Sequence, residues 1–401
     1  MSSTWAFPMP TLSMPVPLKR ALFRLHWLAG LGAGMVLAVV GFTGGLLGFE
    51  GSIVRLLNPQ WRVAADGHTT LAPEQWIANA RAAWPDRQPR AIAWNGDDEP
   101  VMLRMARGPE RGIEVALDPH DGRLFGEPRG AAFFAAVERV HRTLAAGPVG
   151  KQVVGASTAL LIVLVLSGIY LRWPRRARSP SAWLRPDFRP RGRGLLWQLH
   201  AVAGTWLLLF YLLAASTGLW WSYDVYRNAV NRMAGVSAPL RRPSPATQAA
   251  AAPVPLDRAW ATFRAQAPDA TRASVALAGA NGSALEIRYQ TAASPHERAW
   301  NTLKVDAASG AVLGRGLHAD LPRGRRFVQA LFPLHSGSFF GAPGRVLMSL
   351  ASLLLPFFAI TGLWLWLLRR RAAVGRTRRV PRAAVAGMAA TRWTGPDAGT
   401  P

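Results

Sequence analysis

The stretch Leu25–Phe49, LHWLAGLGAGMVLAVVGFTGGLLGF, carries a histidine near its start and no acidic or basic residue after it. A helix of about 21–25 such residues spans roughly 32–37 Å, enough to cross a hydrocarbon core of ~30 Å. Three later runs, over residues 153–173, 199–221 and 344–368, have the same apolar character and no charge in their middle stretch. The sequence therefore predicts four membrane-spanning helices.

The basic residues of the chain predict the orientation of these helices. The net charge is +25, and the short segments before the first span, between spans two and three, and after span four hold nineteen basic residues against two acidic ones. By the positive-inside rule both termini and the middle loop are cytoplasmic, and the two long loops lie outside. We expect a multi-pass membrane protein, in contact with the lipid bilayer and not with nucleic acid.

Four histidines recur in a duplicated register. His26 and His200 open spans one and three, and a Thr-Gly follows each after 17 residues. His141 and His335 precede spans two and four, and a Ser-Gly or Thr-Gly follows each after 26 residues. The first two histidines are 174 residues apart and the second two 194. This spacing indicates a duplicated unit whose two copies run parallel.

Two histidines at each membrane face are the arrangement that two bis-histidine haems require. We assign His26 with His200 to an inner haem b and His141 with His335 to an outer one, with these histidines as the iron ligands. The chain has no cysteine, which excludes thiolate clusters and covalently attached haem. For a lone histidine a satisfied interfacial role is the better interpretation, and the repeated register is what favours ligation.

Other side chains give weaker signals. Gly30 and Gly204 lie four residues after His26 and His200, where they fit either a porphyrin or ordinary helix packing. Arg142 and Arg326 fit haem propionates or interfacial snorkelling. His318 is the candidate to replace one of these four histidines as an iron ligand. The remaining three histidines, His68, His120 and His296, fall in polar contexts typical of the surface.

Each long loop predicts a small α+β domain. Helices are expected over Pro73–Ala83 and Pro255–Ala265, and a strand over Ala284–Tyr289. The segments Asp118–Gly122 and Asp306–Gly310 predict hairpin turns with glycine at positive φ. An insertion is expected over Pro243–Pro255 and a disordered tail from Arg371.

The predicted fold is a four-transmembrane-helix α bundle built from two parallel repeats, with two small periplasmic α+β domains. Its segments are a cytoplasmic tail (1–18), span one (19–49), outer domain one (50–131), an interfacial helix with span two (132–173), a basic loop (174–194), span three (195–221), outer domain two (222–326), an interfacial segment with span four (327–368) and a basic tail (369–401).

Over residues 19–372 the chain resembles the PepSY-associated transmembrane family, in the branch that includes the iron-regulated protein PiuB and the ferric-siderophore reductase FoxB. The residues that carry the resemblance are Leu25–Gly30, Val140–Arg142, Gln198–His200 and Leu334–Gly337. The resemblance implies two b-type haems, PepSY-like periplasmic domains, and reduction of a ferric siderophore or ferric chelate by cytoplasmic electrons. Some relatives carry a flavin/NADPH reductase domain after span four. We expect none in this chain, and we therefore expect the electron donor to be another protein or a small reductant such as a quinol or flavin.

These observations predict an oxidoreductase that passes electrons from the cytoplasmic side to ferric iron in the periplasm. The alternative is a non-enzymatic, membrane-anchored PepSY module that binds peptides or regulates a peptidase. A transporter is disfavoured because the four spans have no intramembrane charge to form a polar pathway.

Overall fold

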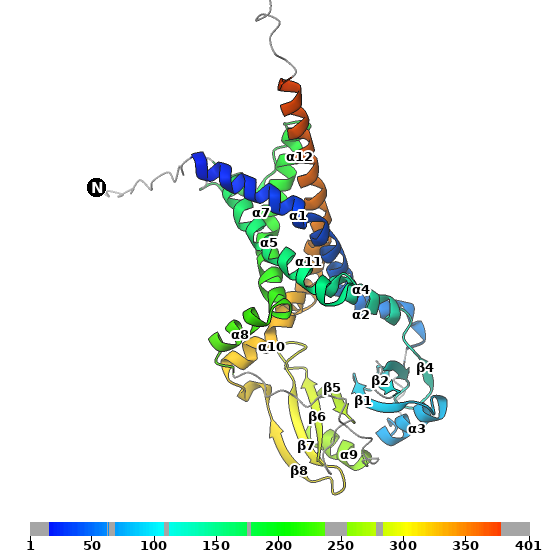
Figure 1. Cartoon of the computed structure of the whole chain (residues 1–401). Helices are drawn as coiled ribbons and strands as arrows, with labels where there is room; N and C mark the ends of the chain where they lie inside the picture. The colour runs from blue at the N-terminus through cyan, green and yellow to red at the C-terminus, as the bar shows by residue number, and fades with distance from the viewer. Residues whose placement is uncertain are drawn as a thin grey trace, which may run out of the picture. The chain divides into compact units, whose positions relative to one another are not determined.

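The computed structural model describes residues 16–61, 63, 69–107, 112–174, 178–236, 255–277 and 284–377. In this part of the chain four segments are long and apolar enough to cross a membrane. The first three are single helices, α1 (Val16–Gly48), α5 (Gly147–Arg172) and α7 (Arg193–Ser222) (Figure 1). The tail was predicted to be disordered from Arg371. That prediction was wrong for its first residues, because the last helix continues to Thr377. The predicted insertion over 243–255 lies almost wholly outside the described residues.

The fourth span is interrupted. It consists of α11 (Gly341–Leu353) and α12 (Leu355–Thr377), which meet at Leu354. Pro356 explains the break, because proline has no N–H for the helical ladder and its ring collides with the carbonyl of the residue four positions earlier. The sequence predicted one continuous run here and did not predict this interruption.

A glycine face on α1 packs against α11 and the start of α12. A Cβ at Gly41 would lie 2.5 Å from the Leu355 Cβ, and a Cβ at Gly45 would lie 2.5 Å from the Leu353 Cγ. Gly48, one turn further on, leaves the same kind of space for Ser349. Small residues at this spacing let two helix backbones approach closely, which is how helices associate where the hydrophobic effect is weak.

Shorter helices adjoin the spans. They are α2 (Glu50–Leu57), η1 (Pro59–Trp61), α4 (Ala131–Thr143), α6 (Pro180–Leu184), α8 (Asp224–Met233), η3 (His318–Asp320), α10 (Arg323–Ser336) and η4 (Ser338–Phe340). Two of them end in left-handed backbone just before a span. Leu144 at the end of α4 has φ 49°, and Gly337 at the end of α10 has φ 79°.

The strands form one antiparallel sheet, in the order β4-β3-β2-β1-β5-β6-β7-β8. The strands are β1 (Gln88–Trp94), β2 (Val101–Ala106), β3 (Ile113–Leu117), β4 (Leu124–Gly126), β5 (Ala270–Ala276), β6 (Ala284–Thr291), β7 (Asn301–Asp306) and β8 (Val312–Gly316). The two expected turns are present, with Gly122 at φ 70° and Gly310 at φ 76°. In each turn the glycine N–H donates to the carbonyl of the aspartate four residues earlier.

The two outer domains predicted from the sequence are therefore not separate. Strand β1, from the first long loop, pairs with β5 from the second, with Ile92 opposite Val275. Helices α3 (Pro73–Ala83) and α9 (Asp257–Gln266) also contact each other, since the rings of Trp76 and Trp260 meet edge-on at 5.8 Å. A single buried core contains side chains of both halves. Each half has one helix against four short strands, and pairing of the two sheets shares one core between them.

The described residues fall into two compact units. One contains the first part of α1, the end of α5, α6, the start of α7 and α12. The other contains the sheet, its helices, the interfacial helices and the remaining parts of the spans. Each unit contains one of the two histidine pairs.

Candidate functional site: two histidine pairs

His141 lies in the last turn of α4 and contacts the Thr-Gly of α1. Its Nδ1 is 2.9 Å from the Val40 carbonyl oxygen and 3.4 Å from the Thr43 Oγ1. The ring lies against Gly44, where a Cβ would be only 2.8 Å from the His141 Cε1. Threonine thus supplies a polar contact and glycine the space for the ring.

His335, in the last turn of α10, repeats this contact on α7. Its Nδ1 is 3.0 Å from both the Ala214 carbonyl oxygen and the Thr217 Oγ1. Gly218 makes room for the ring, because a Cβ there would lie 3.2 Å from the His335 Cε1.

The other two histidines lie within spans and contact the Ser-Gly and Thr-Gly of their partner spans. His26 on α1 has Nδ1 2.8 Å from the Ser167 Oγ of α5, and a Cβ at Gly168 would lie 3.2 Å from its Cε1. His200 on α7 has Nδ1 2.7 Å from the Thr361 Oγ1 of α12. A Cβ on the following residue, Gly362, would lie 3.7 Å from the His200 Cε1.

These hydrogen bonds determine the tautomer of all four rings. Each hydroxyl donates its single proton to the carbonyl four residues earlier on its own helix, for example Thr361 to Phe357 at 2.7 Å and Ser167 to Val163 at 2.6 Å. The hydroxyl oxygen can therefore only accept from the imidazole, so Nδ1 carries the proton. Nε2 then has a free lone pair, and it has no hydrogen-bond partner within the described ranges. A histidine that donates through Nδ1 and presents Nε2 is the usual form of a metal ligand.

The histidines are also paired within each unit. The rings of His141 and His335 have centroids 6.4 Å apart and planes inclined by 58°. Two imidazoles that share one metal at about 2.0–2.1 Å per nitrogen have ring centroids roughly 6 Å apart. His26 and His200 are close enough to interact electrostatically. The donor set and the spacing of the His141–His335 pair fit an iron porphyrin with two axial imidazoles.

The pair outside the spans is held neutral. Burial, with a smaller contribution from the neighbouring His141, lowers the pKa of His335 to about 4. Burial likewise lowers the pKa of His141. Near neutral pH both rings are therefore uncharged, which is the form that binds a metal.

The other predicted site residues are less directly placed. A Cβ at Gly30 would be in ordinary contact with Leu164, at 3.7 Å, and one at Gly204 with Phe358, at 3.6 Å. Both glycines therefore lie at helix contacts, and their role beside a cofactor stays a prediction. Arg142 forms an ion pair with Glu138 at 2.9 Å. Arg326 is half-buried on α10.

Two histidines outside the pairs are buried together. His296 is 8% exposed and His318 6% exposed, with ring centroids 5.4 Å apart. The interpretation of His296 as a surface residue was wrong, because the loop that carries it folds back onto η3 and Phe339. His120 is half-buried, with Nε2 3.1 Å from the Asp97 carbonyl oxygen, and His68 lies outside the described residues.

The residues that position the histidines were not assigned from the sequence. Their signal was present, since Thr-Gly or Ser-Gly follows each histidine at a repeated spacing. In the sequence, however, each histidine is followed by a Thr-Gly or Ser-Gly that it does not contact in the structure. The Thr-Gly that follows His26 on α1 contacts His141, and the Ser-Gly that follows His141 on α5 contacts His26.

The family model described as the PepSY-associated TM region matches residues 23–369, a range that includes all four histidines. The comparison with curated proteins finds no match.

Proposed function

This chain belongs to the PepSY-associated TM family, and we propose that it is an inner-membrane oxidoreductase that holds two b-type haems and passes electrons outward to ferric iron. The observation that carries the proposal is the common environment of the four histidines. Each has Nδ1 engaged by a hydroxyl or carbonyl and Nε2 without a partner in the described chain, and they are grouped as the pairs His26–His200 and His141–His335.

The two imidazoles of each pair would hold the iron of one haem. A haem held by two imidazoles would supply reversible one-electron transfer. The Nδ1 hydrogen bonds orient the rings and raise the basicity of Nε2, which strengthens ligation. Absence of cysteine means that axial ligation and packing alone retain the group.

We further propose that the His26–His200 pair is on the cytoplasmic side, the His141–His335 pair on the periplasmic side, and both termini inside. The support is the excess of basic residues in the short segments next to the spans. The acceptor is a ferric siderophore or ferric chelate, as in the branch of PiuB and FoxB that the sequence resembles. The donor is a quinol, a reduced flavin or a partner protein on the cytoplasmic side.

The test is the absorption spectrum of the purified full-length chain with a pyridine haemochrome count. The expected result is two b-type haems per chain, with a Soret band and sharp reduced α and β bands. His335→Ala should lose one haem and ferric-chelate reduction and leave the other haem spectrally intact. His26→Ala should remove the complementary signal, and His120→Ala is the matched control that should keep both.

A colourless protein would contradict the proposal and support the rival, a peptide-binding PepSY module with the spans as anchors. Retention of both haems in His335→Ala would contradict the pairing.

A further inference from the structure

We infer that the side of the His141–His335 pair formed by Trp221, Phe332 and Arg298 is the docking surface for the electron acceptor, and that this acceptor is an anionic, carboxylate-bearing ferric chelate. The inference rests on the proposed function and adds to it the location and charge of the substrate.

An aromatic path leads from His335 to an exposed arginine. The Trp221 ring is 5.6 Å from the His335 ring, and the Phe332 ring is 6.2 Å from the Trp221 ring. The Arg298 guanidinium lies over the Phe332 ring at 4.4 Å from its centroid. Phe332 is 37% exposed and Arg298 is exposed. A molecule bound to Arg298 is thus separated from the histidine pair by two aromatic rings.

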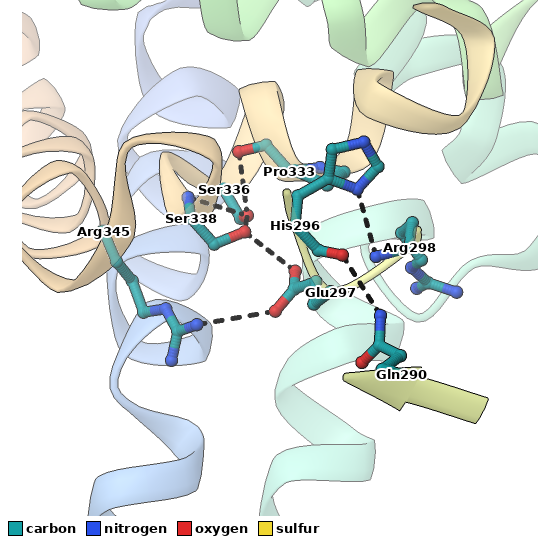
Figure 2. Close-up of polar contacts among 8 residues, drawn as sticks. All are labelled: Gln290, His296, Glu297, Arg298, Pro333, Ser336, Ser338 and Arg345. Carbon is teal, nitrogen blue, oxygen red and sulfur yellow. Dashed lines mark hydrogen bonds and ion pairs between the residues drawn. The ribbon is translucent and has the colours of Figure 1, made fainter. Parts of the chain in front are cut away.

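The loop that presents Arg298 is held in place. The buried Gln290 side chain donates to the His296 and Ala299 carbonyls, at 3.1 and 3.3 Å, and the Arg298 backbone N–H donates to the His296 Nδ1 at 3.2 Å. Figure 2 shows the contact of Gln290 with the His296 carbonyl and that of the Arg298 backbone with the His296 ring. A guanidinium on a fixed loop is preorganised, which reduces the entropy lost on binding an anion.

The same loop is tied to the segment that follows His335. The Glu297 carboxylate accepts from the Ser338 Oγ at 2.9 Å and lies 3.4 Å from the Arg345 guanidinium (Figure 2). Ser338 in turn contacts Ser336, the neighbour of His335, at 2.9 Å between hydroxyl oxygens. The Arg298 loop and the ligand helix α10 are therefore connected by polar contacts.

The His141 side of the pair has opposite chemistry. At the offsets of 174 and 194 residues, the positions equivalent to Trp221 and Phe332 are Leu47 and Glu138. Glu138 and Glu114 lie close enough to Glu50 to raise its pKa, after the larger effect of burial. Leu47 provides no aromatic ring and Glu138 is paired with Arg142, so this side, in the part of the chain that the structure describes, lacks the aromatic path and the free guanidinium that the Trp221 side has.

The charges next to Arg298 support an anionic partner. Arg325 lies seven residues before Phe332 on α10, on the same helical face. Neither Arg298 nor Arg325 forms an ion pair with any residue that the structure describes, and the same holds for Arg323 and Arg326. Guanidinium groups that form no ion pair within the protein can still bind the carboxylates of a ligand.

The test measures binding to the purified full-length protein by calorimetry, with a redox-inert probe so that binding is separated from electron transfer. The probe is gallium(III) citrate, an anionic chelate of a trivalent metal, and the comparison probe is the cation hexaamminecobalt(III). Gallium citrate should bind, and high salt should weaken it. Arg298→Gln should weaken it about five- to tenfold, and Phe332→Leu should weaken it in the same direction. Arg272→Gln removes the same charge from exposed β5 and should leave binding unchanged.

Equal binding of gallium citrate to Arg298→Gln and to the parent protein overturns the inference, and so does tighter binding of hexaamminecobalt than of gallium citrate. The haem spectrum of each variant checks that it is folded and loaded. A haem-free parent protein refutes the proposed function. A loaded parent whose affinity is insensitive to Arg298 refutes only the docking surface.

Discussion

The four glycines that face the histidines give a graded prediction. A Cβ would lie 2.8 Å from the ring at Gly44, 3.2 Å at Gly168 and Gly218, and 3.7 Å at Gly362. Ordinary carbon–carbon contact begins at about 3.5–4.0 Å. Gly44→Ala therefore requires the His141 ring to move by roughly 0.7–1.2 Å, whereas Gly362→Ala requires no movement.

Displacement of the His141 ring should weaken haem binding, because a metal site tolerates little change in its ligand distances. Ligand distances are held to about ±0.2 Å, so a displacement of this size should weaken haem binding at the His141–His335 pair. Changes to the residues that orient a metal's ligands typically lower metal affinity about 10–100-fold. The fold itself should survive, because alanine has a higher helix propensity than glycine by about 1 kcal/mol. Gly168→Ala and Gly218→Ala should fall between the two extremes.

The assay is a haem titration of each purified variant, followed in the reduced α band, with thermal unfolding as a separate measure of the fold. Gly44→Ala should lose the signal that His335→Ala also loses, and Gly362→Ala should retain two haems. If Gly44→Ala binds both haems with unchanged affinity, or if the order of the four variants does not follow the four distances, the assignment of these glycines to the imidazole rings is wrong.

Three further predictions concern the hydrogen bonds, the outer loop and the helix contact. Thr361→Val removes the one hydrogen-bond acceptor that the structure gives the His200 Nδ1, whereas Thr217→Val leaves the His335 Nδ1 its carbonyl acceptor. Thr361→Val should therefore lower haem affinity more than Thr217→Val. Haem retention and midpoint potentials of the two variants measure the difference. Burial, and then His318, lower the pKa of His296, so the fold favours the neutral ring; stability should be full above the unfolded pKa of 6.5 and fall as pH decreases below it. His296→Gln should flatten this fall in thermal unfolding curves, and an unchanged slope would exclude His296 as its cause. Gly45→Val should destabilise the protein, since its Cβ would lie 2.5 Å from Leu353, while Gly32→Val meets no atom within 4 Å and should be tolerated; equal melting temperatures would contradict the packing argument.

Local and periodic features were accessible from the sequence. The spans follow from length and the absence of charge, and the helix over Pro73–Ala83 was predicted with the bounds that α3 has. Gly122 and Gly310 were predicted at positive φ and have it. The repeated histidines identified the candidate site, because chemistry placed at a fixed register is visible without a structure.

Long-range pairing was not accessible. Two sheets predicted as separate domains form one sheet through β1 and β5, whose paired residues are 179 to 185 positions apart in the chain, and no local pattern specifies which edge strands pair. The burial of His296 against His318, and the stacking of Arg298 on Phe332, depend on the path of a loop between strands.

The sequence by itself determined that the chain has four apolar spans and four histidines in a repeated register at or near their starts, because hydrophobicity, charge and spacing are properties of the chain in one dimension. Only the tertiary structure decided which hydroxyl each imidazole contacts, since each acceptor lies on a different helix from its histidine and between 98 and 161 residues away. Those contacts fix the proton on Nδ1 and leave the Nε2 lone pair free, and an arrangement of that kind exists only once the helices have packed.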